Sequence, residues 1–172
     1  DQAGFDIYLL DGGYKSFRRW TAAVFKDERN VMVLGGPTGS AKTAILNGLA
    51  LLGEQVIDLE ALANHKGSAF GALGKGEQPS QEQFENLLAL RWNYTDGSER
   101  LWLENESRTI GSCSLPATIF NTIRSAPVVD VRIGMERRRK RILEEYAIFP
   151  VSILKATTEK IGKRLGPQHL KN

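Results

Sequence analysis

The clearest chemistry in the sequence lies in the eight residues 36–43. They read Gly-Pro-Thr-Gly-Ser-Ala-Lys-Thr and match the phosphate-binding pattern G-x-x-x-x-G-K-[ST], the P-loop, at every fixed position except the sixth. Small residues let backbone N–H groups surround an anion, the lysine adds a positive charge, and the last threonine offers a hydroxyl to Mg²⁺. We expect a phosphate- or diphosphate-binding loop made by Gly36, Thr38, Gly39, Ser40, Ala41, Lys42 and Thr43, with Lys42 catalytic and Thr43 the metal ligand.

Ala41 stands where the pattern has its second glycine. A positive φ costs an alanine roughly 1 kcal/mol or more, whereas a right-handed helical conformation costs it little. We therefore expect Ala41 to have helical backbone angles, and we expect phosphate binding to survive the replacement.

Acidic residues form the second group with chemical potential. Asp58 and Glu60 lie at the end of one predicted strand, and Glu104 and Glu106 at the end of another. The ligand crevice of a parallel sheet lies at the carboxyl ends of its strands, so these side chains are expected near the P-loop. Glu104 is the best candidate for a catalytic acid linked to a metal. Helix capping or a solvated loop position is the alternative for each of the four.

Positive charge is concentrated late in the chain. Residues 131–172 hold 11 Lys and Arg against 4 Asp and Glu, whereas residues 1–130 hold 12 against 16. Such a segment suits an anionic partner such as phosphate or RNA, although solvated helix faces also collect basic residues.

Five basic residues in this segment are consecutive, from 137 to 141. On a helix, Arg141 shares a face with both Arg137 and Arg138, so two guanidinium groups can reach one phosphate. We expect Arg137 and Arg141 to act in catalysis, as a lid does in many P-loop kinases, and Arg138, Arg139 and Lys140 to contact RNA phosphates. A solvated helix face is again the alternative.

The elements that position these residues alternate between strand and helix. Apolar runs predict strands at 5–10, 31–34, 56–59, 101–104 and 128–131, and helical spacing predicts helices at 14–25, 42–52, 83–90, 115–123, 136–146 and 152–165. Ser80 is the expected cap of the third helix, and Gly166-Pro167 the expected stop of the last. This order predicts an α/β fold, a mainly parallel sheet flanked by helices in a P-loop NTPase-like, kinase-like domain.

Composition excludes several classes of protein. The apolar runs of this 172-residue chain are only a few residues long, which excludes a membrane span. The single cysteine, Cys113, excludes an internal disulfide and a multi-cysteine zinc site, and it fits a reducing, cytoplasmic setting. We expect Cys113 to pack as a small apolar residue.

Three stretches outside the P-loop resemble the tRNA 2-selenouridine synthases. The first is VIDLEALANHKGSAFG at 56–71, with QPSQ at 78–81 and FEN at 84–86. The second is ENESRTIG at 104–111, with Leu-Pro at 115–116, and the third is the segment 136–146. The resemblance covers nearly the whole chain, and the 56–71 block is far more specific than the P-loop.

The resemblance implies a transferase with two chemical steps. Members of this family geranylate the wobble 2-thiouridine of certain tRNAs with geranyl diphosphate, and then replace the sulfur by selenium from selenophosphate. The expected partners are a tRNA carrying wobble 2-thiouridine and an enzyme that supplies selenophosphate. Mg²⁺ is the expected cofactor, and binding of ATP or GTP is left open, as is the oligomeric state.

The resemblance also implies a domain organisation. Residues 1–26 look like the last strand and helix of an incomplete rhodanese-like domain, and residues 27–172 like a P-loop domain with basic C-terminal helices. The rhodanese cysteine would lie upstream of Asp1 and the family continues past Asn172, so we expect a fragment that holds the diphosphate-handling half of the enzyme.

Residues in and beside the family-specific stretches are candidates for contact with substrate. They are Asp58, Glu60, His65, Lys66, Ser68, Glu106, Ser107 and Arg108. For His65, Lys66 and Ser68, fastening the loop is the structural alternative.

Two other functions fit parts of the pattern. A small-metabolite or nucleotide kinase would use the same P-loop, acidic strand ends and arginine-rich lid. A non-catalytic RNA-binding module would use the basic segment, although it holds only Tyr146 and Phe149 for base stacking. A GTPase is disfavoured because no Asn-Lys-x-Asp sequence is present.

Overall fold

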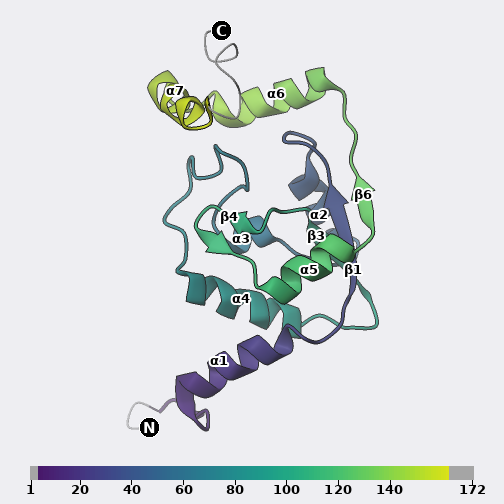
Figure 1. Ribbon diagram of the computed structural model, residues 1–172, viewed down its shortest axis with the longest axis vertical. Coiled ribbons are helices and arrows are strands. Elements are labelled where there is room, and N and C mark those ends of the chain that lie inside the picture. Colours follow the sequence, from purple (N-terminus) through teal and green to yellow (C-terminus); the bar gives the residue numbers. More distant parts are fainter. Residues whose placement is uncertain (1–3, 163–172) are drawn as a thin grey trace.

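The computed structural model describes residues 4–162 as a central sheet with helices around it (Figure 1). The strands are β1 (Asn30–Gly35), β2 (Gln55–Ile57), β3 (Arg100–Glu104), β4 (Thr109–Ile110), β5 (Cys113–Ser114) and β6 (Val128–Asp130). The helices are α1 (Gly13–Val24), α2 (Lys42–Leu51), α3 (Leu59–Leu62), α4 (Gln81–Asn93), α5 (Ala117–Ser125), α6 (Met135–Tyr146) and α7 (Val151–Lys160).

The main sheet has the strand order β2-β3-β1-β6, and every neighbouring pair is parallel. β1 is central, with Val33 opposite Leu103 on one side and Val128 on the other. Because all four strands run the same way, their carboxyl ends lie at one edge, where the loops after β1, β2 and β3 converge. The predicted α/β, P-loop NTPase-like fold is confirmed.

Alternation along the strands divides the core between the two faces of the sheet. Val31 and Val33 of β1 pack with α4 and α5 in the larger core, whereas Leu34 packs with Leu46 of α2 in the smaller one. The strand β3 divides in the same way, with Leu103 in the larger core and Trp102 in the smaller. Helices on both faces therefore bury the sheet and leave its carboxyl edge for ligands.

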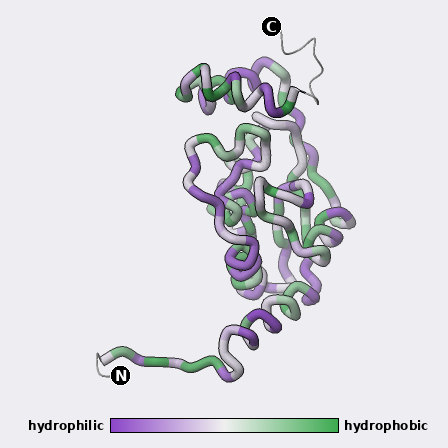
Figure 2. Tube along the Cα trace, turned by 60° about the vertical axis from the view of Figure 1, so that its left-hand side comes forward, coloured by the Kyte–Doolittle hydropathy of each residue, from purple (hydrophilic) through white to green (hydrophobic). Residues whose placement is uncertain are grey.

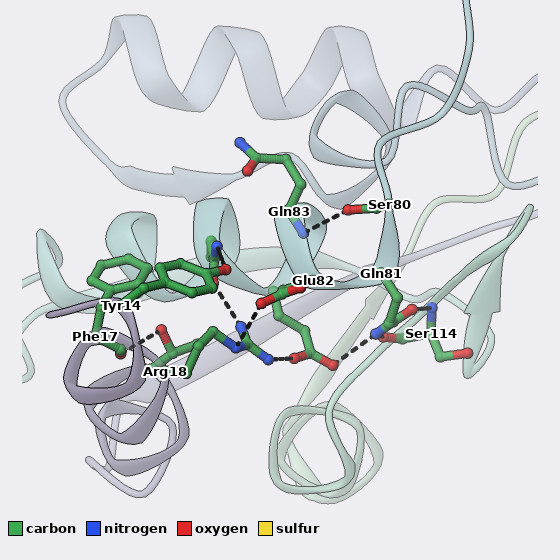
Figure 3. Close-up of polar contacts among 11 residues, drawn as sticks. Tyr14, Phe17, Arg18, Ser80, Gln81, Glu82, Gln83 and Ser114 are labelled. Atoms are coloured by element: carbon green, nitrogen blue, oxygen red, sulfur yellow. Dashed lines mark hydrogen bonds and ion pairs between the residues drawn. The ribbon is translucent and has the colours of Figure 1, made fainter.

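Helix α1 is fastened to α4 by a polar network, which Figure 3 shows in close-up. Arg18 donates to Asn86 Oδ1 at 2.6 Å and forms an ion pair with Glu85. The side-chain amide of Gln81, at the start of α4, donates to Glu85, donates to the Ser114 carbonyl and accepts from the Ser114 N–H of β5. α1 is thereby linked through α4 to the β4–β5 hairpin.

The predicted strand at 5–10 is wrong, because these residues have no regular secondary structure and are exposed. Figure 2 shows them extending away from the rest of the molecule. A strand needs a neighbouring strand to satisfy its N–H and C=O groups, and within residues 4–162 strand pairing is confined to the main sheet and β4–β5. The helix expected after this segment does form, as α1, and its assignment to a rhodanese-like domain stays a prediction.

The remaining local expectations are largely met. Ser80 caps α4 by accepting a hydrogen bond from the Gln83 N–H at 3.1 Å, and Cys113 is buried in the larger core. The short helix α3 and the β4–β5 hairpin were not predicted, and the predicted end of the last helix at 165–167 lies outside the described residues. No helix within residues 4–162 is both long and apolar enough to span a membrane.

Candidate functional site

The P-loop connects β1 to α2 and borders a cavity of about 610 Å³ at the carboxyl edge of the sheet. The other walls come from the loop 65–68, the segment 105–107 and the end of α6. Asp58 and Glu60 reach the cavity from the region after β2. The loop, the acidic strand ends and the basic helix therefore surround one space large enough for a small phosphorylated ligand.

The prediction for Ala41 is wrong. Its φ of 68° and ψ of 28° lie in the left-handed region, where it directly precedes the first residue of α2. Gly39, two residues earlier, also has a positive φ, of 80°. The P-loop therefore keeps the conformation that a glycine would favour at position 41, and the alanine carries a strain cost of roughly 1 kcal/mol.

Two of the other P-loop side chains donate hydrogen bonds to neighbouring oxygen atoms, and Ser40 does not. Lys42 Nζ donates to the Gly36 carbonyl at 3.2 Å, and Thr43 Oγ1 donates to Glu104 Oε1 at 3.2 Å. Ser40 is 1% exposed, and its Oγ has no hydrogen-bond partner among the described residues. An anion in the loop would offer acceptors to Lys42 and Ser40, and the positive end of α2 favours negative charge there.

Three glutamates converge behind the P-loop and are called here the acidic triad: Glu60 at the start of α3, Glu104 at the end of β3, and Glu106 in the loop that follows. Each contributes a carboxylate oxygen to a group in which all these oxygens lie within 4.8 Å of one another. Parallel β2 and β3 end side by side, which is why side chains more than 40 residues apart in sequence meet here.

The pKa values of all three carboxyl groups are raised. Burial, followed by the charges of Glu104 and Glu106, raises the pKa of Glu60 to about 8. Burial raises the pKa of Glu104 to about 7, against the opposing effect of Lys42, and burial also raises the pKa of Glu106. At neutral pH the triad therefore holds protons unless positive charge is supplied.

The loop after α3 is held by contacts with the end of α6. Lys66 forms an ion pair with Glu145 and lies 5.5 Å from the centre of the Tyr146 ring. Ser68 Oγ is 3.5 Å from the Tyr146 hydroxyl, and the rings of Phe70 and Tyr146 are 5.5 Å apart. Lys66 and Ser68 thus line the cavity and fasten the loop at the same time.

His65 and Asp58 both line the cavity, and each also makes a hydrogen bond that supports the local backbone. His65 Nδ1 accepts a hydrogen bond from the Gly67 N–H at 3.1 Å, and burial lowers the pKa of its imidazole. Asp58 caps α3 by accepting from the Ala61 N–H at 2.8 Å. A neutral His65 is therefore expected at pH 7.

The arginines of α6 that contact the P-loop are not the pair that the sequence predicted. Arg138 Nε donates to the Thr38 carbonyl at 3.0 Å, and Arg141 donates to the Gly39 carbonyl at 3.1 Å while lining the cavity. Arg137, predicted to be catalytic, lies instead in a separate pocket with residues 132–136. Arg138 and Arg141 are three residues apart and share a helix face, which decides which guanidinium groups meet the P-loop.

The remaining predicted residues lie farther from the cavity or play supporting roles. Arg139 and Lys140 are exposed and paired with acidic residues of their own helix. Arg108 is exposed and does not line the cavity. Ser107 does line it, and its hydroxyl donates to the Thr109 carbonyl at 2.6 Å.

Glu145 and Tyr146 were not predicted as site residues. Both line the cavity, Glu145 four residues after Arg141 on the same face of α6. The i to i+4 spacing from Arg141 was the signal that could have found Glu145. No local pattern indicated Tyr146, because its partners come from a loop about 80 residues earlier.

A P-loop fold implies a Mg²⁺ ion beside the bound phosphate. The residues present fit such an ion. Thr43 supplies a hydroxyl, and the fully buried Glu104 has a second oxygen, Oε2, without a hydrogen-bond partner among the described residues. Thr43 and Glu104 would together hold the ion.

Comparison with known proteins places this arrangement in one family. Residues 29–172 match the family described as tRNA 2-selenouridine synthase AAA domain. The chain is 39% identical over 151 residues to a tRNA 2-selenouridine synthase from Pseudomonas syringae pv. syringae, covering 85% of this chain and 40% of that protein. It is 39% identical to a synthase from Shewanella pealeana, with 84% and 40% covered, and 35% identical to one from Pseudomonas putida, with 99% and 47% covered.

The chain thus spans less than half the length of these curated relatives. Its P-loop, acidic triad and family-specific loop 56–71 all fall within the aligned region of the Pseudomonas putida protein, which matches 99% of the chain. The chain belongs to the tRNA 2-selenouridine synthase family and carries the AAA domain of that family over residues 29–172.

Proposed function

We propose that this chain is the part of a tRNA 2-selenouridine synthase that binds the diphosphate of a prenyl donor and stabilises it as a leaving group. The observation that carries the proposal is the cavity in which the P-loop, Lys42 and Arg141 meet beside three glutamates. Two cationic side chains, the N-terminus of α2 and loop N–H groups suit a diphosphate better than a neutral metabolite.

The proposed reaction is alkylation of the sulfur of wobble 2-thiouridine. The sulfur attacks the first carbon of geranyl diphosphate, a carbon–sulfur bond forms, and the carbon–oxygen bond to diphosphate breaks. Diphosphate leaves with the electron pair, and the N3 proton of the base is released. Lys42 and Arg141 would stabilise the charge that grows on the leaving oxygen, which is the main way such a site lowers the barrier.

A Mg²⁺ ion held by Thr43 and Glu104 would supply further Lewis-acid stabilisation of the diphosphate when bound. The chain's own contribution is to place the leaving group. The P-loop fixes the diphosphate against α2, and the loop 65–68 together with Tyr146 closes one side of the cavity. Limiting water at this point protects an allylic donor from hydrolysis.

The exposed basic face of α6 is proposed as the tRNA contact. Arg139 and Lys140 carry side chains that are 67% and 80% exposed, and Arg141 of the same helix lines the cavity. Phosphate contacts of this kind bring affinity without sequence preference and weaken steeply with salt. Replacement of sulfur by selenium from selenophosphate is proposed only for the whole protein, from the family's name and the resemblance described above.

The test is transfer of the prenyl group. The chain is incubated with geranyl diphosphate and a tRNA containing 2-thiouridine, and the mass of the modified nucleoside is followed. We expect geranyl addition that Lys42→Ala abolishes and that Lys26→Ala, a matched change of an exposed lysine after α1, leaves intact. A Lys42→Ala protein that still transfers at the wild-type rate would overturn the proposal.

A kinase is the second candidate, favoured by the contact between Thr43 and Glu104 and by the two arginines that reach the P-loop. These are the parts that phosphoryl transfer needs for metal binding and for charge stabilisation. Tight binding and hydrolysis of ATP without binding of geranyl diphosphate would favour this candidate over the prenyl transferase.

A further inference from the structure

The acidic triad has the arrangement of a metal site. Its three carboxylates come from α3, from the end of β3 and from the following loop, and their nearest oxygens lie within 4.8 Å of one another. Two oxygens bound to the same Mg²⁺ at about 2.1 Å are at most about 4.2 Å apart. Small side-chain rotations would therefore be enough to bring all three oxygens onto one ion.

An independent observation points to a missing positive charge. The side chain of Glu104 is almost completely buried, at 1% exposure, and its Oε2 has no hydrogen-bond partner in the described part of the chain. Its other oxygen, Oε1, already accepts from Thr43. A buried carboxylate oxygen without a donor is costly, and a bound cation is one of the few groups that removes this cost.

The nearby cationic side chains do not supply that charge through a direct ion pair. Lys42 Nζ donates to the Gly36 carbonyl, and Lys66 is paired with Glu145. Within residues 4–162, no Lys or Arg lies within 4.0 Å of a carboxylate oxygen of the triad. Lys42 acts on the triad only at longer range.

The loop after α3 passes close to two carboxylates of the triad at Gly67. Gly67 has a φ of 62°, and a Cβ added there would lie 2.6 Å from Glu60 Oε1 and 2.7 Å from Glu106 Oε2. A side chain at position 67 would therefore have to displace these carboxylates, and the positive φ would strain its backbone. The Gly67 N–H donates in turn to His65 Nδ1, which fixes the position of this part of the loop.

From these contacts we infer that Glu60, Glu104 and Glu106 together bind one divalent cation of the Mg²⁺ or Mn²⁺ class, and that they do so without any bound phosphate. Oxygen ligands of this kind select hard cations. Glu104 is also a ligand of the P-loop ion described above. The two coordination modes differ because the P-loop ion takes part of its coordination from phosphate oxygens, whereas here Glu60 and Glu106 supply that part. Only the role of this cation rests on the proposed function. A cation here would offset the repulsion between the three carboxylates and an incoming diphosphate.

The test is a titration of the chain with Mn²⁺ in a buffer free of phosphate and nucleotide, with free Mn²⁺ followed by electron paramagnetic resonance. It is run at pH 8 because the ligands must be deprotonated. We expect about one Mn²⁺ per chain with a dissociation constant below ~1 mM, displaced by excess Mg²⁺. The isosteric changes Glu60→Gln, Glu104→Gln and Glu106→Gln should each weaken binding by about tenfold or more.

Glu144→Gln is the matched control, since Glu144 lies on the exposed face of α6 and pairs with Lys140. It should leave Mn²⁺ binding unchanged. Circular dichroism and thermal melting check that each variant is folded. No binding by the wild-type chain, or equal binding by the wild type and the three triad variants, would overturn the inference.

Lys42→Ala separates this inference from the proposed function. It removes a positive charge that opposes cation binding, so Mn²⁺ should bind as tightly as in the wild type or more tightly, while binding of inorganic diphosphate should weaken by about 100-fold. A wild-type chain that binds Mn²⁺ but no diphosphate retains the cation site and refutes the diphosphate site. A chain that binds diphosphate but Mn²⁺ only after diphosphate is added refutes the cation site alone.

Discussion

The acidic triad and the basic helix α6 are the two charged regions beside the P-loop, and they differ in burial and in ion pairing. The triad is largely buried, has no direct ion pair within the described residues, and has raised pKa values. Most of the charged side chains of α6 are exposed, and two of them pair with glutamates of the same helix, Arg139 with Glu136 at 3.5 Å and Lys140 with Glu144 at 4.0 Å. The buried carboxylates of the triad, whose pKa values are shifted, therefore indicate the candidate active site better than the more numerous exposed charges of α6 do.

Within α6, too, some arginines contact the P-loop and others stay in solvent. Arg138 and Arg141 reach the carbonyls of Thr38 and Gly39, whereas Arg139 remains in solvent. Neighbouring residues on a helix point about 100° apart, so consecutive arginines cannot serve one site together. The acidic triad and α6 should therefore respond differently to substitution.

The largest effect is expected at Lys42, the cation between the two regions. Lys42→Ala should weaken binding of inorganic diphosphate by about 100-fold, because a charge-assisted contact with a bound anion is lost. Isothermal titration calorimetry measures the dissociation constants, and Lys26→Ala serves as the control. A loss of less than about threefold would mean that the P-loop does not bind phosphate through its lysine.

The next effect concerns the pH dependence of stability. Between the unfolded pKa of 4.5 and the folded value of about 7, the Glu104 carboxyl binds more protons in the folded chain than in the unfolded one. Its contribution to the free energy of unfolding therefore falls as the pH rises through this window. Without divalent cations, wild type should lose about 2 kcal/mol more than Glu104→Gln between pH 5 and pH 8.

Urea unfolding at a series of pH values, with a chelator present, measures this difference. Carboxylates outside the triad contribute equally to both proteins, so the difference reports the Glu104 carboxyl together with its effect on Glu60. Equal pH profiles for the two proteins would contradict the raised pKa. Mn²⁺ added at pH 8 should restore stability to wild type more than to Glu104→Gln if the triad binds the ion.

A smaller effect should separate two arginines of α6. Arg141→Ala should weaken diphosphate binding by about tenfold, because Arg141 lines the cavity, and Arg139→Ala by less than about twofold, because Arg139 lies in solvent. Calorimetric titrations of both variants at the same salt concentration test this. Equal losses would show that α6 acts through its overall charge and not through one face.

The smallest effect is expected at the uncharged position Ala41. Its φ of 68° is unfavourable for alanine, so Ala41→Gly should raise the free energy of unfolding by about 0.5–1 kcal/mol. Urea unfolding measures it, with Ala44→Gly, inside α2, as a control that should destabilise. A destabilised Ala41→Gly would show that position 41 is not strained in solution.

Local sequence patterns were sufficient for most elements of this fold. Alternating and helical spacing predicted β1, α2, α4 and α6, and the capping role of Ser80 followed from its place before Gln81. Two local expectations failed for a physical reason. The apolar run 5–10 has strand-forming residues but no neighbouring strand among the described residues, and Ala41 adopts the backbone angles of the loop against its own preference.

Residues close together in the chain were enough to predict the P-loop, the parallel α/β order, the acidic strand ends and the family resemblance. Only the tertiary structure decided that Glu60, Glu104 and Glu106 meet, that Arg141 and not Arg137 reaches a loop 102 residues earlier, and that Tyr146 packs on the loop 65–70. Those contacts depend on how parallel strands pair and how α6 is rotated about its axis, and no local pattern encodes either.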